Sequence, residues 1–177
     1  LYTGFGNTLV GMPYNSGEGK RIDVVAEVLE DAGFPTEVSQ RVNSTVWTKT
    51  LVNAGINALG TLTGLRNGEL LKDNDLKQLM VWVVQEGMMV ADKLGVQLDG
   101  DPVEITFRTA EATANNLNSM LQDVQKGKRT EVEYINGAIS RLGEKVRVPT
   151  PLNRLLTLLI ARMEKSGRKT VHAYASI

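Results

Sequence analysis

The stretch from Trp47 to Leu71 has helical spacing, yet it carries polar side chains where a buried helix would have apolar ones. If it is helical, Lys49, Asn53 and Asn57 fall one turn apart and line a single face. Asn is a poor residue for a helix interior because its amide competes for backbone hydrogen bonds. This face is therefore either the solvated side of an amphipathic helix or a row of hydrogen-bonding groups around a ligand. Periodicity alone favours the solvated side.

Helical spacing dominates the chain from Arg41 onward, and Asn43 or Ser44 is the expected N-cap of the first helix. Later helices are expected over 73–95, 102–125, 130–146 and 151–163, with Gly95 and Gly127 as stops. Thr130 opens the sequence T-E-V-E, which has the spacing of a capping box. The sequence therefore predicts a mainly α-helical domain.

The N-terminal segment follows a different pattern. Leu1–Val10 and Phe34–Ser39 have the composition of short strands, and the spacing of 22–29 between them is helical, with Gly33 as its stop. One strand–helix–strand unit is too small to fold alone. We interpret it as the last piece of a larger α/β cofactor domain. Because the chain does not begin with Met, we also expect it to be cut from a longer protein.

Composition excludes several classes of function. The 20 basic and 20 acidic residues balance, so neither nucleic acid nor a membrane surface is an expected partner. Cysteine is absent and His172 is the single histidine, so we expect no disulfide, no thiolate chemistry and no metal site. No apolar run approaches the roughly 20 residues of a membrane helix. These features together predict a cytoplasmic protein.

Five motifs occur in one order along the helical part of the chain. They are W-x-K-x-L-V-N-x-x-I-N-x-L at 47–59, NGEL at 67–70, NxxSMLQDV at 116–124, TEVEYINGAI at 130–139 and VPTPLN at 148–153. Together they resemble the C-terminal helical domain of ketopantoate reductase (2-dehydropantoate 2-reductase). The resemblance covers roughly residues 41–162.

This resemblance implies a fold and an activity. It implies an all-helical substrate and dimerisation domain over 41–177, of the 6-phosphogluconate dehydrogenase C-terminal type, after a remnant of a Rossmann domain over 1–40. The family reduces 2-dehydropantoate to (R)-pantoate with NADPH, in pantothenate and coenzyme A biosynthesis, and a homodimer is expected. No G-x-G-x-x-G motif opens the chain, so the main cofactor site is expected in a missing N-terminal domain. The isolated chain is therefore expected to be inactive.

The resemblance also assigns roles to the polar face. Lys49 matches the family's catalytic lysine, the general acid in reduction, and Asn53 and Asn57 match its substrate-binding asparagines. A lysine suits the proton-donating role if it is buried on an amide-lined face, since burial disfavours its charged form. The alternative for Lys49 is an ordinary surface lysine.

Three further residues match the family's site. Asn116 and Ser119 match substrate contacts, although without the family they would be an ordinary helix break. Glu131 matches the active-site glutamate and could also contact the cofactor. A glutamate in a first helical turn is, however, stabilised by the helix dipole whatever its function.

Two alternatives remain at this level. The segment NALGTLTG at 57–64 lacks the proline that the family has after the second asparagine, which leaves the end of this helix open. A related 2-hydroxy-acid dehydrogenase would share most of the motifs. A non-catalytic helical dimerisation module would keep the scaffold without the chemistry.

Overall fold

The computed structural model describes residues 6–12 and 20–174. The chain divides into two compact units, Leu1–Val46 and Trp47–Ile177. Among the described residues, no helix is both long enough and apolar enough to cross a membrane.

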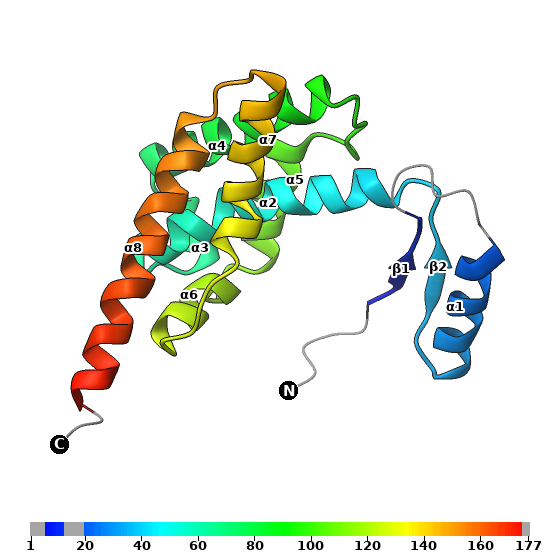
Figure 1. The fold of residues 1–177 in the computed structure, drawn as a ribbon, viewed down its shortest axis with the longest axis horizontal. Coiled ribbons are helices and arrows are strands. Elements are labelled where there is room, and N and C mark those ends of the chain that lie inside the picture. Colours follow the sequence, from blue (N-terminus) through cyan, green and yellow to red (C-terminus); the bar gives the residue numbers. More distant parts are fainter. Residues whose placement is uncertain (1–5, 13–19, 175–177) are drawn as a thin grey trace. The chain divides into compact units, whose positions relative to one another are not determined.

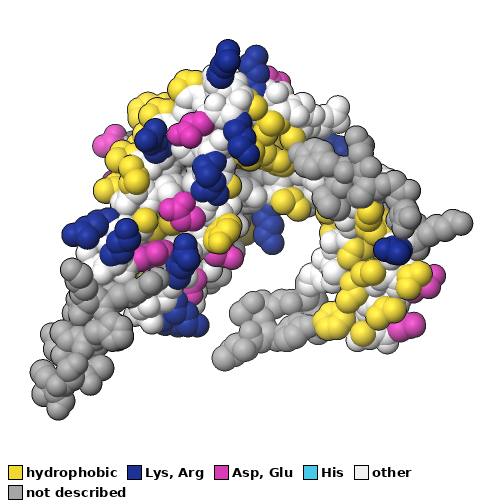
Figure 2. Space-filling model, viewed as in Figure 1, with side chains coloured by type: hydrophobic (Ala, Val, Ile, Leu, Met, Phe, Trp, Pro, Cys, Tyr) yellow, Lys and Arg dark blue, Asp and Glu magenta, His cyan; other side chains and the backbone are white. Residues whose placement is uncertain are grey.

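The N-terminal unit is the expected strand–helix–strand unit. Strand β1 (Thr8–Val10) pairs in parallel with β2 (Thr36–Val38), and helix α1 (Lys20–Asp31) connects them. Gly33 follows α1 with a φ of 85°, which confirms it as the helix stop. Residues 1–5 of the first predicted strand lie outside the described residues. Apolar side chains cover much of this unit's surface in Figure 2, and the exposed ones on α1 are Val24, Val25 and Val28.

Helix α2 (Val42–Thr63) spans the division in the chain, and from Trp47 onward it belongs to the C-terminal, helical unit. The amide of Thr45 already donates to the carbonyl of Arg41, 3.2 Å away, so the helix starts before both predicted caps. The prediction of Asn43 or Ser44 as N-cap is therefore wrong, because this first turn closes on backbone atoms. The face opposite the polar one is buried as expected, with Leu51 and Ala58 fully inaccessible.

Capping residues and glycines set the ends of several of the remaining helices. They are α3 (Asn67–Leu70), α4 (Asn74–Lys93), α5 (Pro102–Ala112), α6 (Ser119–Gln125), the 3-10 helix η1 (Val132–Tyr134), α7 (Asn136–Val146) and α8 (Pro151–Tyr174). Asp73 caps α4 by accepting from the amides of Asp75 and Leu76. Gly95 and Gly127 have positive φ, as predicted for stops. The helix predicted over 102–125 is two helices, because Asn118 caps a new one.

The T-E-V-E segment does not form the predicted capping box. The Thr130 hydroxyl donates to Glu164 Oε1 at 2.5 Å, and Glu133 Oε2 lies 3.3 Å from Arg141 Nη1 instead of reaching back to a backbone amide. A 3-10 turn replaces the expected α-helical start, and α7 begins only at Asn136. Side chains distant in sequence therefore outcompete the local capping pattern.

The core of the helical unit lies between α2, α4, α7 and α8, and α7 runs beside α8 in Figure 1. Its largest fully buried apolar side chains are Leu51, Leu70, Met80, Met120, Ile139, Ile160, Val83, Val84, Val90 and Val132. Glycine allows close approach at several contacts. A Cβ atom on Gly68 of α3 would lie 2.5 Å from the Cβ and 2.8 Å from the Cα of Ala114.

We predict that Gly68→Ala lowers the free energy of unfolding by about 1–3 kcal/mol, because the methyl group would meet backbone that cannot move freely. Gly137→Ala is the matched control. Its methyl group would meet the ends of the Glu133 and Arg141 side chains and, at 3.3 Å, the Cγ2 methyl of Thr157, but no backbone atom, so its effect should stay within about 1 kcal/mol. Urea titration followed by circular dichroism measures both values. Equal losses in the two variants would contradict this account of the α3 contact.

Candidate functional site

The polar face of α2 runs from solvent into the protein. Lys49 is exposed, Asn53 is half-buried and Asn57 is only 6% exposed. A purely solvated face would not bury Asn57, so that interpretation is wrong. Within this chain Lys49 has the exposure of a surface lysine, and no hydrogen bond or ion pair joins it to another described residue. The three side chains still share one helical face.

The buried end of this face meets the start of α6. The Thr61 hydroxyl donates to the carbonyl of Asn57 at 2.7 Å and approaches Asn118 Oδ1 at 3.4 Å. Asn118 Oδ1 also accepts from the amide of Leu121 at 2.9 Å, which caps α6. Ser119 is the next residue. The structure thus brings the α2 face to the helix start that carries Ser119.

A short helix links the same region to Asn116. The amide of Asn67, at the start of α3, donates to the carbonyl of Asn116 at 3.1 Å. Its side-chain Nδ2 donates to the Thr113 hydroxyl at 2.8 Å. The two predicted residues Asn116 and Ser119 are both exposed. They lie at the break between α5 and α6, which the helix predicted over 102–125 did not include, and this break lies beside α2 and α3.

Two buried polar atoms at this junction have no hydrogen-bond partner among the described residues. They are Asn67 Oδ1 and Asn118 Nδ2. Buried polar atoms are normally satisfied, so an unpaired acceptor and an unpaired donor in one region are unusual. Sequence analysis did not select either asparagine. The available signals were the NGEL motif for Asn67 and the N-cap preference of asparagine for Asn118.

Glu131 lies in the segment between α6 and α7. It is exposed and precedes η1, where its carbonyl accepts from the amides of Tyr134 and Ile135 at 2.8 and 3.0 Å. It is therefore not in the first turn of an α-helix, contrary to expectation. No hydrogen bond or ion pair joins its carboxylate to Lys49 within the part of the chain that the structure describes.

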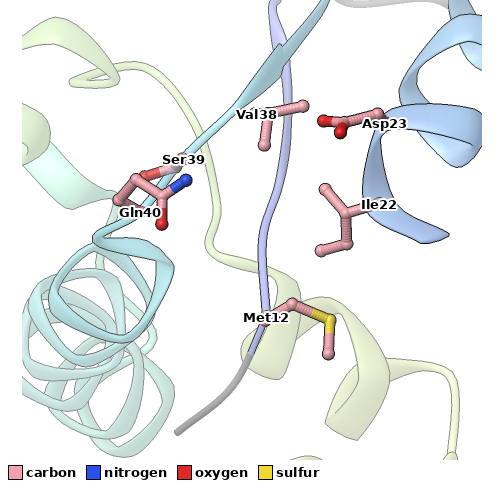
Figure 3. Close-up of a pocket in the computed structure, with 6 residues that line it drawn as sticks. All are labelled: Met12, Ile22, Asp23, Val38, Ser39 and Gln40. Carbon is pink, nitrogen blue, oxygen red and sulfur yellow. The ribbon is translucent and has the colours of Figure 1, made fainter. Parts of the chain in front are cut away.

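The N-terminal unit holds a small pocket between α1 and β2 (Figure 3). Its lining side chains are Met12, Ile22, Asp23, Val38, Ser39 and Gln40. The volume is about 130 Å³. Ligand sites commonly occupy roughly 300–1,000 Å³, so a dinucleotide does not fit this pocket. None of the predicted site residues lines it. Across the described residues, no group of three or more His, Cys, Asp or Glu side chains could hold a metal ion.

Comparison with known proteins gives a consistent pattern. The family model "Ketopantoate reductase PanE/ApbA C terminal" matches residues 41–164. The 2-dehydropantoate 2-reductase of Pyrococcus abyssi is 42% identical over 95% of this chain and 56% of its own length. That of Pyrococcus horikoshii is 40% identical over 94% of the chain and 55% of its length. The chain thus spans about half the length of the curated relatives it matches.

Solved structures agree with these sequence matches. A PanE/ApbA family ketopantoate reductase from Ralstonia eutropha JMP134 has a TM-score of 0.82 at 30% identity, over 92% of this chain and 53% of that one. A D-mandelate dehydrogenase in complex with NADH has a TM-score of 0.80 at 29% identity, over 92% and 57% of the two chains. The fold is therefore shared by enzymes named for two different substrates.

The contact between α2 and α6 generates a prediction, because a Cβ atom on Gly60 would lie 2.5 Å from Asn118 Nδ2. Gly60→Ala should destabilise the chain by about 1–3 kcal/mol. Asn118→Ala should cost about 1 kcal/mol through the lost cap. The double variant should lose less than the sum by about 0.5–3 kcal/mol, because removing the amide also removes the clash. Strictly additive losses in urea titrations would show that Gly60 and Asn118 are not in contact.

Proposed function

The chain belongs to the ketopantoate reductase family, and on that premise we propose that it forms the substrate-binding half of a 2-dehydropantoate 2-reductase. The observation that carries the proposal is the polar face of α2. Its amides run from half-buried Asn53 to buried Asn57 and end beside the α6 start. A carboxylate and hydroxyl-bearing substrate needs this combination of donors and acceptors.

Reduction of a 2-keto acid requires a hydride at the keto carbon and a proton at the oxygen. A nicotinamide cofactor supplies hydride in such reactions, and we propose NADPH for the full-length protein. The described residues of the N-terminal unit do not fit that cofactor, so its site is assigned to the part of the protein beyond this chain. Lys49 is proposed to donate the proton to the developing alkoxide as general acid.

The other residues are proposed to hold the substrate. The amides of Asn53 and Asn57 can each donate to a substrate oxygen and accept from a substrate hydroxyl. Asn116 and Ser119 close the same site from the α6 side. Glu131 is proposed to accept from a substrate hydroxyl or to contact the cofactor. Orientation by several weak contacts lowers the entropic part of the barrier.

The proposed division of the protein follows from this assignment. Residues 1–40 are proposed to complete a dinucleotide-binding domain, and 41–177 to form the substrate domain. A cytoplasmic location for such a biosynthetic enzyme stays a prediction.

A related 2-hydroxy-acid dehydrogenase is the second candidate, because D-mandelate dehydrogenase shares this fold at 29% identity. We predict that the full-length protein prefers 2-dehydropantoate over phenylglyoxylate, the keto acid of mandelate, by at least about 100-fold in kcat/KM. A site built to bond a substrate hydroxyl rejects analogues that lack it by large factors. Steady-state assays with both keto acids decide between the two functions, and a preference for phenylglyoxylate would support the dehydrogenase alternative.

We predict that Lys49→Ala in the full-length protein lowers kcat by about 10²- to 10⁴-fold, because it removes the proton donor. Lys72→Ala, an exposed lysine after α3, is the control and should retain full turnover. Circular dichroism should show that both variants keep the helical content of the parent. Turnover near the parent's value in Lys49→Ala would refute the catalytic assignment.

We also propose that the protein forms a homodimer through the outer face of α8. Leu155, Leu158 and Leu159 are 51%, 61% and 43% exposed there. Large exposed apolar patches mark association sites. Leu158→Lys should shift the full-length protein to monomer in sedimentation velocity, whereas Met89→Lys, on exposed α4 surface, should not. A parent protein that is monomeric at micromolar concentration would contradict the proposal.

A further inference from the structure

A carboxylate lies buried in the middle of the helical unit. Glu86 of α4 is only 6% exposed. Its Oε1 accepts from the amide of Leu152 at 2.9 Å, and its Oε2 accepts from the amide of Asn153 at 3.0 Å. Both amides belong to the first turn of α8. The unpaired N–H groups and the dipole of that helix start therefore compensate the buried carboxylate.

The carboxylate fixes the orientation of two buried amides in series. Asn153 Nδ2 donates to Glu86 Oε2 at 2.8 Å and to the carbonyl of Val83 at 3.0 Å. Its Oδ1 must then face Asn136, whose Nδ2 donates to it at 3.0 Å. The same Nδ2 donates to the carbonyl of Ala54 at 3.3 Å. Only one orientation of each side-chain amide matches donors to acceptors along the series. The carboxylate of Glu86 therefore fixes the orientation of Asn153, and Asn153 fixes that of Asn136, which donates to α2.

Packing alone does not account for this arrangement. Asn136 and Asn153 are both fully inaccessible to solvent. Asn136 Oδ1 has no hydrogen-bond partner among the described residues. A leucine would fill a similar volume without an unsatisfied acceptor, and a buried polar group is weak evidence for stability. The arrangement is therefore better explained if these asparagines hold the helices that they join in fixed relative positions.

The Asn136 end of the series connects the segments that carry the two parts of the proposed site. Ala54 directly follows Asn53 on α2. Asn136 opens α7, and backbone hydrogen bonds through η1 tie this helix start to Glu131. The hydrogen bond from Asn136 Nδ2 to the carbonyl of Ala54 is therefore a polar tie between α2 and the segment that follows Glu131.

We propose that Glu86, Asn153 and Asn136 are positioning residues, which hold the lysine and asparagine face of α2 in register with the segment that carries Glu131. The inference rests on the proposed function for its catalytic consequence. It identifies a set of residues that contact neither substrate nor cofactor and yet set the geometry in which both are bound.

The test compares Asn136→Leu with Ile139→Val in the full-length protein. Both residues are buried on α7, but Ile139 takes no part in the hydrogen-bonded series. We expect Asn136→Leu to lower kcat for 2-dehydropantoate by about 10- to 100-fold, because small displacements of reacting groups are costly. The KM of Asn136→Leu should change by less than about threefold. Ile139→Val should leave kcat within about twofold of the parent's value, measured at a temperature where both variants are folded. Equal kcat in the two variants would overturn the inference.

A second readout does not depend on the reaction. With ¹⁵N-labelled asparagine, the side-chain amide resonances of Asn53 and Asn57 should shift in Asn136→Leu and stay in place in Ile139→Val. Unchanged resonances in Asn136→Leu would overturn the inference. If the parent protein reduces no 2-dehydropantoate, the proposed function fails while these spectra still decide the positioning role. If Asn136→Leu does not fold, Glu86→Gln replaces it in both experiments, with the same expected direction and the same overturning result.

Discussion

Close approach to α2 is the constraint on which the helical unit depends. A Cβ atom on Gly55 would lie 2.9 Å from a methyl group of Val84 and 3.2 Å from one of Thr106, and a Cβ on Gly87 would collide with Leu51. Glycine at these contacts lets α4 and α5 approach α2 more closely than side chains would allow. The apolar side of α2 is therefore closely packed against α4 and α5. On its polar side, the solvent exposure of the side chains falls along the helix from Lys49 to Asn57.

The glycine-rich end of α2 has the same explanation. The glycines and threonines of NALGTLTG at 57–64 left the end of this helix open at the level of sequence. In the structure Gly60 lies against Asn118, and the adjacent Thr61 bonds both Asn57 and Asn118. The glycine accommodates an asparagine that caps another helix. Gly60 thus allows the contact between α2 and α6 without interrupting α2, which continues to Thr63.

Local signals made most of the fold predictable. Caps and stops such as Asp73, Gly33 and Gly95 act within a few residues, and the parallel strand–helix–strand unit follows from local pattern. The predictions failed where distant side chains decide. The Thr130 hydroxyl donates to Glu164 of α8 as well as accepting from the amide of Val132, and the Glu86 network joins helices far apart in sequence. The polar face of α2 was predictable by spacing, but not how deeply each of its residues would be buried.

The exposure of Lys49 bears on how the proposed site would work. In water, hydrogen bonds to a small acid exchange with solvent and contribute little net affinity. The proposed chemistry therefore requires that the outer end of the α2 face be covered when substrate is bound, whereas Asn57 at the inner end is already shielded. On this view the helical unit positions the hydrogen-bond donors and acceptors. Exclusion of water from Lys49, Ser119 and Glu131 then increases the net contribution of their hydrogen bonds to substrate binding.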